Sequence, residues 1–414
     1  MQVLSDEERI KILSDIVSIK TVNSNELEVA QYLEKLFNRY GIRSHIDTVT
    51  DGRANLIATV GSSQPVIGIS GHMDVVSEGN HDHWTYDPFT LTEDQGYLYG
   101  RGAADMKSGL AALAIALIEI KESGKLTQGT IKFMATVGEE MEQSGSQQLF
   151  EKGYADDLDA LLIAEPSFPS LVYAHKGSMD FRIKSKGRAS HSSLPFLGQN
   201  AIKPLLEFIQ NINQEYEKIT QSVKGESLDF SNMINNLGSQ LPNHITKEKA
   251  QELIQGLVMT NSIVQGGTQV NSVPDFATAE FNVRTIPEYN NNKVKALFNE
   301  YIEQANHNGA SLTQELYLDL EPVVTTGQNR LVELGFDIAK SHFSNERDLI
   351  VTPTVAVTDA SNLLKGKDEN FPFLMFGPGN GPHQINECVE KANYLEFVEY
   401  YIEFITSYLN EENE

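Results

Sequence analysis

The sequence predicts an α/β fold: a mostly parallel sheet with flanking helices, plus an inserted α+β domain. The chain has 414 residues. A single hydrophobic core usually stops growing at roughly 250–300 residues, so we expect two domains. In the first part of the chain, short runs that are apolar on both faces alternate with helical stretches, which is typical of a parallel sheet covered by helices. From about residue 178, apolar and polar residues alternate instead, which indicates half-solvated strands.

Hydrophobic periodicity places the elements of the first domain. Apolar residues at helical spacing predict helices within the first 40 residues, and Gly41 marks their end. A buried helix is expected at 106–120 and a shorter one at 147–152. The candidate strands are Leu56–Val60, Val66–Ser70, Ile131–Val137 and Ala160–Ala164.

The middle of the chain has the pattern of a small domain inserted into the larger one. Two strand-like runs, Met179–Gly187 and Ala277–Arg284, enclose an amphipathic helix around 201–219 and a polar, irregular stretch at 222–256. From about residue 290 the α/β pattern returns, and it ends in a helix over 394–409. We therefore expect a catalytic domain of residues 1–177 and 290–414, and an inserted domain of residues 178–289.

Composition and charge exclude several classes of partner. The formal net charge of −25 would repel nucleic acid and anionic membrane surfaces. The single cysteine, Cys388, excludes a disulfide scaffold and a cysteine-rich zinc site. The N-terminus lacks an apolar signal segment, and the longest apolar run, Leu110–Ile118, is shorter than the about 20 residues that span a bilayer. We expect a cytoplasmic protein.

Charged residues directly follow three of the candidate strands. His72 and Asp74 follow the strand at 66–70. Glu139 and Glu140 follow the strand at 131–137, and Glu165 follows the strand at 160–164. Ligands of open α/β sheets bind beyond the carboxyl ends of strands, so these side chains are expected at one edge. A carboxylate beside an imidazole can fix its tautomer and leave the other nitrogen for a metal. Taken singly, each residue has an ordinary interpretation as a solvated surface group.

Two further residues complete a metal-ligand set. Asp105 follows Gly100-Arg101-Gly102 at the start of the buried helix, where it is either a helix N-cap or a carboxylate that bridges two metals. This segment lacks the third glycine of a dinucleotide-binding loop. His383 lies in a loop rich in glycine and proline, where a lone histidine is usually solvated. Together the nitrogen and oxygen donors suffice for two zinc ions: His72, Asp105, Glu140, Glu165 and His383.

These motifs closely resemble those of the M20 metallopeptidase family, over nearly the whole chain. The most specific pieces are Ser70-Gly71-His72-Met73-Asp74, Gly100-Arg101-Gly102 running on to Asp105-Met106-Lys107, Gly138-Glu139-Glu140, Glu165-Pro166 and the His383 loop. The resemblance implies two Zn²⁺ ions, for which Co²⁺ or Mn²⁺ can substitute. It implies that His72 and Glu165 bind one ion, that Glu140 and His383 bind the other, and that Asp105 bridges them.

The resemblance also implies the roles of residues that bind no metal. Asp74 orients His72, and Glu139 is the general base and acid. The peptide bond between Asp105 and Met106 is expected to be cis. The inserted domain corresponds to the family's lid and dimerisation domain, so a homodimer is expected, in which His191 reaches the partner's active site. Asn271 and Arg284 match lid positions that hold the substrate carboxylate.

The function implied by the resemblance is hydrolysis of the amide bond of an N-acyl amino acid. The stretch from His72 to Gly102 most resembles Gram-positive proteins that are assigned as succinyl-diaminopimelate desuccinylases. This resemblance makes N-succinyl-LL-2,6-diaminopimelate, a compound of lysine and diaminopimelate biosynthesis, the leading substrate. An acetylornithine-type deacetylase and a di- or tripeptidase remain open, because 222–256 is longer and more polar than in a compact family lid. A non-catalytic binding homologue is the third alternative, and the presence of all five ligands argues against it.

Overall fold

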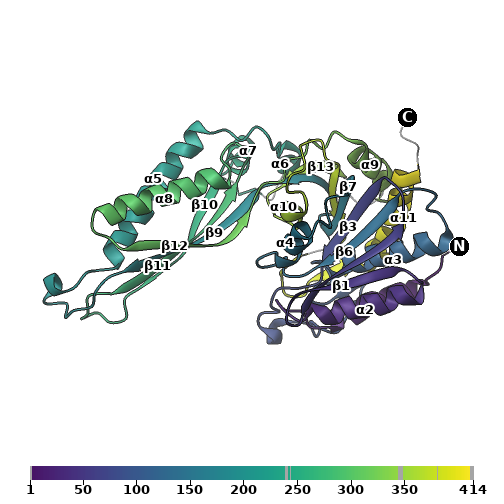
Figure 1. Cartoon of the computed structure of the whole chain (residues 1–414), viewed down its shortest axis with the longest axis horizontal. Helices are drawn as coiled ribbons and strands as arrows, with labels where there is room; N and C mark the ends of the chain where they lie inside the picture. The colour runs from purple at the N-terminus through teal and green to yellow at the C-terminus, as the bar shows by residue number, and fades with distance from the viewer. Residues whose placement is uncertain (1, 238–240, 243, 344–347, 380, 411–414) are drawn as a thin grey trace. The chain divides into compact units, whose positions relative to one another are not determined.

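The computed structural model describes residues 2–237, 241–242, 244–343, 348–379 and 381–410. These residues form two compact units (Figure 1). Unit 1 comprises Met1–Ala174, Thr325–Thr352 and Thr358–Glu414. Unit 2 comprises His175–Val324 and Pro353–Val357. Among the described residues, no helix is both long and apolar enough to cross a membrane.

Unit 1 is built on an eight-stranded sheet with the order β1-β2-β6-β3-β7-β14-β8-β13. The central strands β6, β3, β7 and β14 run parallel to one another, as expected. Strand β2 is antiparallel to β1 and β6, and β8 is antiparallel to β14. The strands are β1 (Arg43–Thr50), β2 (Arg53–Gly61), β3 (Val66–His72), β6 (Thr130–Thr136), β7 (Ala160–Pro166), β8 (Ser170–His175), β13 (Ile350–Thr354) and β14 (Phe373–Gly377). All four predicted strands are present.

Helices flank this sheet. They are α1 (Asp6–Ser18), α2 (Glu26–Arg39), α3 (Lys107–Ser123), α4 (Ser144–Glu151), α9 (Arg330–Phe343), α10 (Ala360–Leu363) and α11 (Lys391–Asn410). Helix α3 is buried from Lys107 to Ile120 and packs against α1, α11 and the central strands. Gly109 permits this close approach, because a Cβ atom there would lie 2.0 Å from the carbonyl oxygen of Ala164 on β7.

A small three-stranded antiparallel sheet lies in the same unit. Its order is β15-β5-β4, from β4 (Thr92–Asp94), β5 (Tyr97–Tyr99) and β15 (Cys388–Glu390). In its register Cys388 is opposite Tyr99. This pairing places the residues just before β15 beside those just after β5, namely the chain that leads from His383 and the chain that leads to Asp105.

Unit 2 has its own core beneath a four-stranded antiparallel sheet, ordered β10-β11-β9-β12. The strands are β9 (Gly177–Lys186), β10 (Val258–Gly266), β11 (Phe276–Thr285) and β12 (Leu312–Leu320). Helices α5 (Ile202–Ser222) and α8 (Asn291–His307) cover one face of this sheet (Figure 1). The rings of Phe181 on β9 and Phe298 on α8 stack with centroids 4.3 Å apart.

Unit 2 is larger than the inserted domain expected at 178–289. It extends to Val324, because β12 pairs with β9 and α8 packs on the same sheet. A helix followed by a strand has the same local pattern in either domain, so periodicity alone could not assign 291–320. The stretch 222–256 also contains α6 (Ser231–Leu237) and α7 (Lys247–Gln255), where an irregular segment was expected. Both helices are short and rich in polar residues, so the composition of this stretch indicated a loop.

Candidate metal centre

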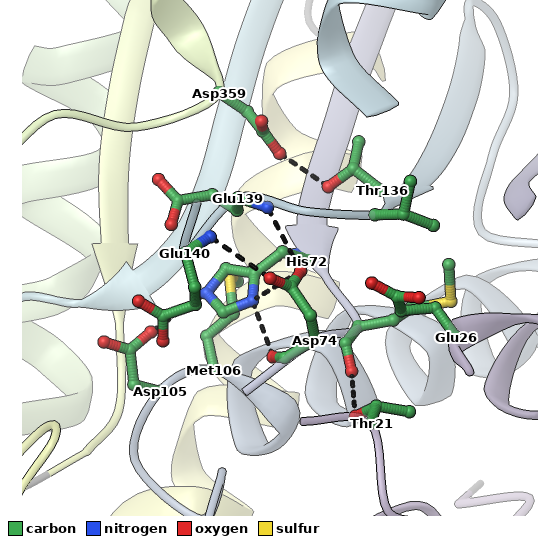
Figure 2. A network of polar contacts seen from close by, with 12 residues as sticks. Thr21, Glu26, His72, Asp74, Asp105, Met106, Thr136, Glu139, Glu140 and Asp359 are labelled. Carbon is green, nitrogen blue, oxygen red and sulfur yellow. Dashed lines mark hydrogen bonds and ion pairs between the residues drawn. The ribbon is translucent and has the colours of Figure 1, made fainter. Parts of the chain in front are cut away.

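The parallel strands bring four charged segments to one edge of the sheet. His72 is the last residue of β3, Glu165 lies near the end of β7, Glu139 and Glu140 follow β6, and His383 follows β14. Carboxyl ends of parallel strands share an edge, so these residues meet although they are far apart in sequence. Figure 2 shows His72, Asp105, Glu139 and Glu140 close together at this edge.

The two oxygens of Asp105 face different histidines. Oδ1 lies 3.0 Å from Nε2 of His72, and Oδ2 lies 3.3 Å from Nε2 of His383. Nε2 of His72 is also 3.6 Å from Oε1 of Glu165. On the other side, Nε2 of His383 is 2.9 Å from Oε2 of Glu140. The arrangement therefore has two halves, His72 with Glu165 and His383 with Glu140, and Asp105 lies between them.

Asp74 connects His72 to the loop after β6. Nδ1 of His72 lies 2.9 Å from the carbonyl oxygen of Asp74 and 3.6 Å from its carboxylate. The carboxylate accepts hydrogen bonds from the backbone N–H groups of Glu139 and Glu140, both at 3.1 Å (Figure 2). The backbone carbonyl is thus the nearer group that orients the His72 ring, and the carboxylate fixes the position of the two glutamates.

Glu139 lies in the same cluster but in a different environment. Its Oε1 accepts a hydrogen bond of 3.0 Å from the side-chain amide of Gln143. Gln143 is buried and has a left-handed backbone (φ 52°), and its own N–H donates to the carbonyl of Gly138. Glu139 could ligate a metal together with His72 and Glu165 on distance alone. Its bond to Gln143 leaves the other oxygen for a proton.

The acids of this cluster strongly perturb one another. Burial raises the pKa of Glu139 and of Glu165 well above the usual value. Burial alone would lower the pKa of His72, but the negative charge of Glu165 and the hydrogen bond to Asp105 outweigh it and raise the pKa. Hydrogen bonds to Asp105 and Glu140 raise the pKa of His383 to about 10. So many buried acids stabilise any positive charge placed among them.

The donor atoms fit divalent metal ions. Two groups have ligand atoms that all lie within 4.8 Å of one another: His72 with Glu139 and Glu165, and His72 with Asp105 and Glu140. Imidazole nitrogen and carboxylate oxygen are ligands of zinc, and a carboxylate with its oxygens turned to two sides can bridge two ions. The left-handed conformation of His383 (φ 63°) is uncommon for a residue with a side chain and places the imidazole toward Asp105.

Three further residues that the sequence predicted as site residues belong to unit 2, whereas the cluster belongs to unit 1. His191 and Asn271 are exposed on neighbouring loops, since Ser192 N–H donates to the Asn271 carbonyl and His191 pairs with Ser272. Arg284 lies near the far end of β11, about 25 Å along the strand from the Asn271 loop at about 3.3 Å per residue. One chain therefore does not bring Asn271 and Arg284 to the same carboxylate.

Several buried residues that no sequence motif marks also support the cluster. Glu387 lies four residues after His383 and is buried beneath the Asp105 loop, where it pairs with Arg101. Gln143 contacts Glu139, and the carboxylate of Asp359 accepts a hydrogen bond of 2.5 Å from Thr136 at the end of β6 (Figure 2). No local pattern marks Glu387, because the strand that it precedes has three residues and itself ends in a glutamate. The peptide bond between Asp105 and Met106 is cis, as expected.

The chain is similar to known proteins in both sequence and fold. The model of Peptidase family M20/M25/M40 matches residues 68–407. A Staphylococcus aureus protein named probable succinyl-diaminopimelate desuccinylase is 44% identical over 99% of this chain and 100% of its own length. An M20 family metallo-carboxypeptidase from Sulfolobus solfataricus has a TM-score of 0.80 at 19% identity, covering 97% of this chain and 99% of that one.

A solved structure from Bacillus subtilis, described as a dinuclear metal binding peptidase from the M20 family, has a TM-score of 0.64 at 16% identity, covering 98% of each chain. At this identity the likeness concerns the fold alone. The full-length match at 44% identity and the family match over most of the chain confirm the resemblance seen in the motifs. The chain belongs to peptidase family M20/M25/M40.

Proposed function

We propose that this protein is a two-zinc hydrolase that cleaves the amide bond of an N-acyl amino acid, with N-succinyl-LL-2,6-diaminopimelate as the leading substrate. The observation that carries the proposal is Asp105, whose two oxygens face His72 and His383. The succinylated substrate is supported by the name of the Staphylococcus aureus relative, which is matched over its full length.

In this proposal, His72 and Glu165 hold one zinc ion, His383 and Glu140 hold the other, and Asp105 bridges them. Bound zinc polarises a carbonyl group and lowers the pKa of water. Co²⁺ and Mn²⁺ accept the same nitrogen and oxygen donors and can substitute.

Glu139 moves the proton. It takes one proton from the attacking water and returns it to the nitrogen of the leaving amine, so that amide and water become a carboxylic acid and an amine. At neutral pH the acid then loses its proton and the amine gains one, which gives a carboxylate and an ammonium. Gln143 holds one oxygen of Glu139 by a hydrogen bond and leaves the other oxygen for the proton. Asp74 accepts hydrogen bonds from the backbone N–H groups of Glu139 and Glu140 and so keeps both residues near His72.

A homodimer formed through unit 2 accounts for the position of the remaining residues. β10 is an edge strand, and apolar side chains are exposed on it and nearby, including Ile263, Val264 and Phe276. An exposed apolar edge is a template for pairing with another chain. Since Asn271 and Arg284 lie at opposite ends of the sheet, both can hold one substrate carboxylate only if they come from different subunits. His191, beside Asn271, would then stabilise the oxyanion in trans.

The substrate is tested with a panel of amides. Protein loaded with zinc should hydrolyse N-succinyl-LL-2,6-diaminopimelate with a kcat/KM at least about tenfold higher than N-acetylornithine or a tripeptide, because one well-placed charged contact is typically worth about 1.5–3 kcal/mol. Release of free amine measures all the substrates alike. Preference for acetylornithine or for peptides would replace the leading substrate with that alternative. Absence of hydrolysis of every amide would support a binding homologue.

Glu139→Gln should reduce turnover by about 10²–10⁴-fold, because it removes the proton acceptor. The variant should retain both metal ions, since Glu139 is not one of the five proposed ligands. Glu142→Gln is the matched control: Glu142 is in the same loop, but its half-exposed side chain pairs with Arg53 at 3.2 Å. Normal turnover by Glu139→Gln, or an equal loss in the control, would contradict the assignment of the base.

Action of His191 in trans predicts complementation. His191→Ala should lose roughly 10²–10³-fold in turnover, as expected for one oxyanion donor. Mixing it with Glu139→Gln under conditions of subunit exchange should restore part of the activity, because one site of the mixed dimer then has both residues intact. Heterodimers can be shown with two affinity tags. If they form and activity does not return, His191 does not act in trans.

A further inference from the structure

The bridging aspartate and His383 are connected beneath the metal centre by one buried carboxylate, that of Glu387. Its Oε1 accepts three backbone hydrogen bonds from a single loop: from Gly102 at 2.9 Å, Ala104 at 2.9 Å and Asp105 at 3.0 Å. Its Oε2 pairs with Nη1 of Arg101 at the start of the same loop. Glu387 is 1% exposed and Arg101 2%. The loop that carries Asp105 is therefore wrapped around this carboxylate.

The same residue is fixed to the chain that carries His383. Glu387 directly precedes β15, and its carbonyl accepts a hydrogen bond of 3.0 Å from Gly100, which continues the pairing of β15 with β5. One residue earlier, Oδ1 of Asn386 accepts from the backbone of Thr85 at 2.8 Å. The side chain of His383 is 53% exposed and contacts only acids of the cluster that we describe, Glu140 and Asp105. The anchored residues that follow it hold its backbone end of the loop.

Close packing also holds the loop that carries His383 against the loop that carries Asp105. Gly379 approaches Ala104 so closely that a Cβ atom there would lie 2.8 Å from the Ala104 Cα. Both loops are thus held against each other by their backbones and by Glu387. A site that binds two ions needs its bridging carboxylate and its terminal ligands at a fixed separation, and groups behind the ligands commonly set that separation.

We infer that Glu387 is a positioning residue that holds Asp105 and His383 in the geometry for binding metal before any metal is present. This inference rests on the proposed two-zinc site. Glu387 contacts no metal-binding atom: it acts on Asp105 through the backbone N–H and on His383 through the chain. The buried guanidinium of Arg101 offsets the cost of burying the carboxylate.

Two substitutions separate the charge of Glu387 from its reach. Glu387→Gln keeps an acceptor oxygen but turns an amide N–H toward Arg101. Glu387→Asp keeps the charge but withdraws the oxygen from the three N–H groups by about one bond length. Both should weaken zinc binding, measured by competition with a chromophoric chelator, by about 10–100-fold, which is typical for residues behind metal ligands.

Glu119 offers a matched control near the other end of α3, about 18 Å along the helix from Lys107 at about 1.5 Å per residue. It is also buried, accepts backbone N–H bonds from Val3 at 2.8 Å and Leu4 at 2.9 Å, and pairs with Arg9 at 3.1 Å. Glu119→Gln should lower the melting temperature but leave zinc affinity unchanged. Unchanged zinc affinity in folded Glu387→Gln and Glu387→Asp, or an equal loss in Glu119→Gln, would overturn the inference. A wild-type protein without zinc affinity would instead contradict the proposed function.

Hydrogen exchange on the metal-free wild-type protein tests the inference without any variant. If Glu387 holds the loop in advance, the amide hydrogens of Gly102, Ala104 and Asp105 should exchange as slowly as those in the centre of β3. Rapid exchange that becomes slow only when zinc is added would mean that the metal orders the loop, and would overturn the inference.

Discussion

The structure depends on one constraint: the carboxylate of Asp105 must lie between two histidines that come from opposite ends of the chain. Its oxygens are 3.0 Å from His72 and 3.3 Å from His383. Each histidine has a second acid behind it, Glu165 or Glu140. So many acids in a buried place are costly unless cations compensate them. The rest of unit 1 serves to gather these groups at one edge of its sheet.

The parallel strands bring these groups together although long stretches of chain separate the strands in sequence. The order β6-β3-β7-β14 places four carboxyl ends side by side, and each end carries a charged residue. Asp105 lies just before α3, and this helix can approach β7 closely because Gly109 has no side chain to meet the Ala164 carbonyl. Backbone hydrogen bonds to two buried carboxylates then fix the loops. Asp74 holds the loop after β6, and Glu387 holds the loop that carries Asp105. On the proposed function, metal binding would therefore depend on acids that do not themselves bind the metal.

Much of the fold and of the metal centre could be predicted from the sequence. The remaining features could not, and the reasons are physical. Apolar runs that end in His72, Glu140 and Glu165 predicted both the strands and their charged edge, because strand direction and ligand edge are linked. Periodicity could not place α8 and β12 in unit 2, since partner choice between sheets leaves no local trace. The role of Glu387 is also invisible locally: it arises from the pairing of β15 with β5, across almost 300 residues of chain.

The most direct test of the account is the electron density of zinc. Crystals grown with excess zinc, with diffraction data collected on both sides of the zinc absorption edge, should show two anomalous peaks about 3.5–4 Å apart, the usual spacing of two-metal sites. Asp105 should lie between the peaks, with His72 and Glu165 at one and His383 and Glu140 at the other. A single peak, or two peaks that do not share Asp105, would contradict the bridging role on which the account depends.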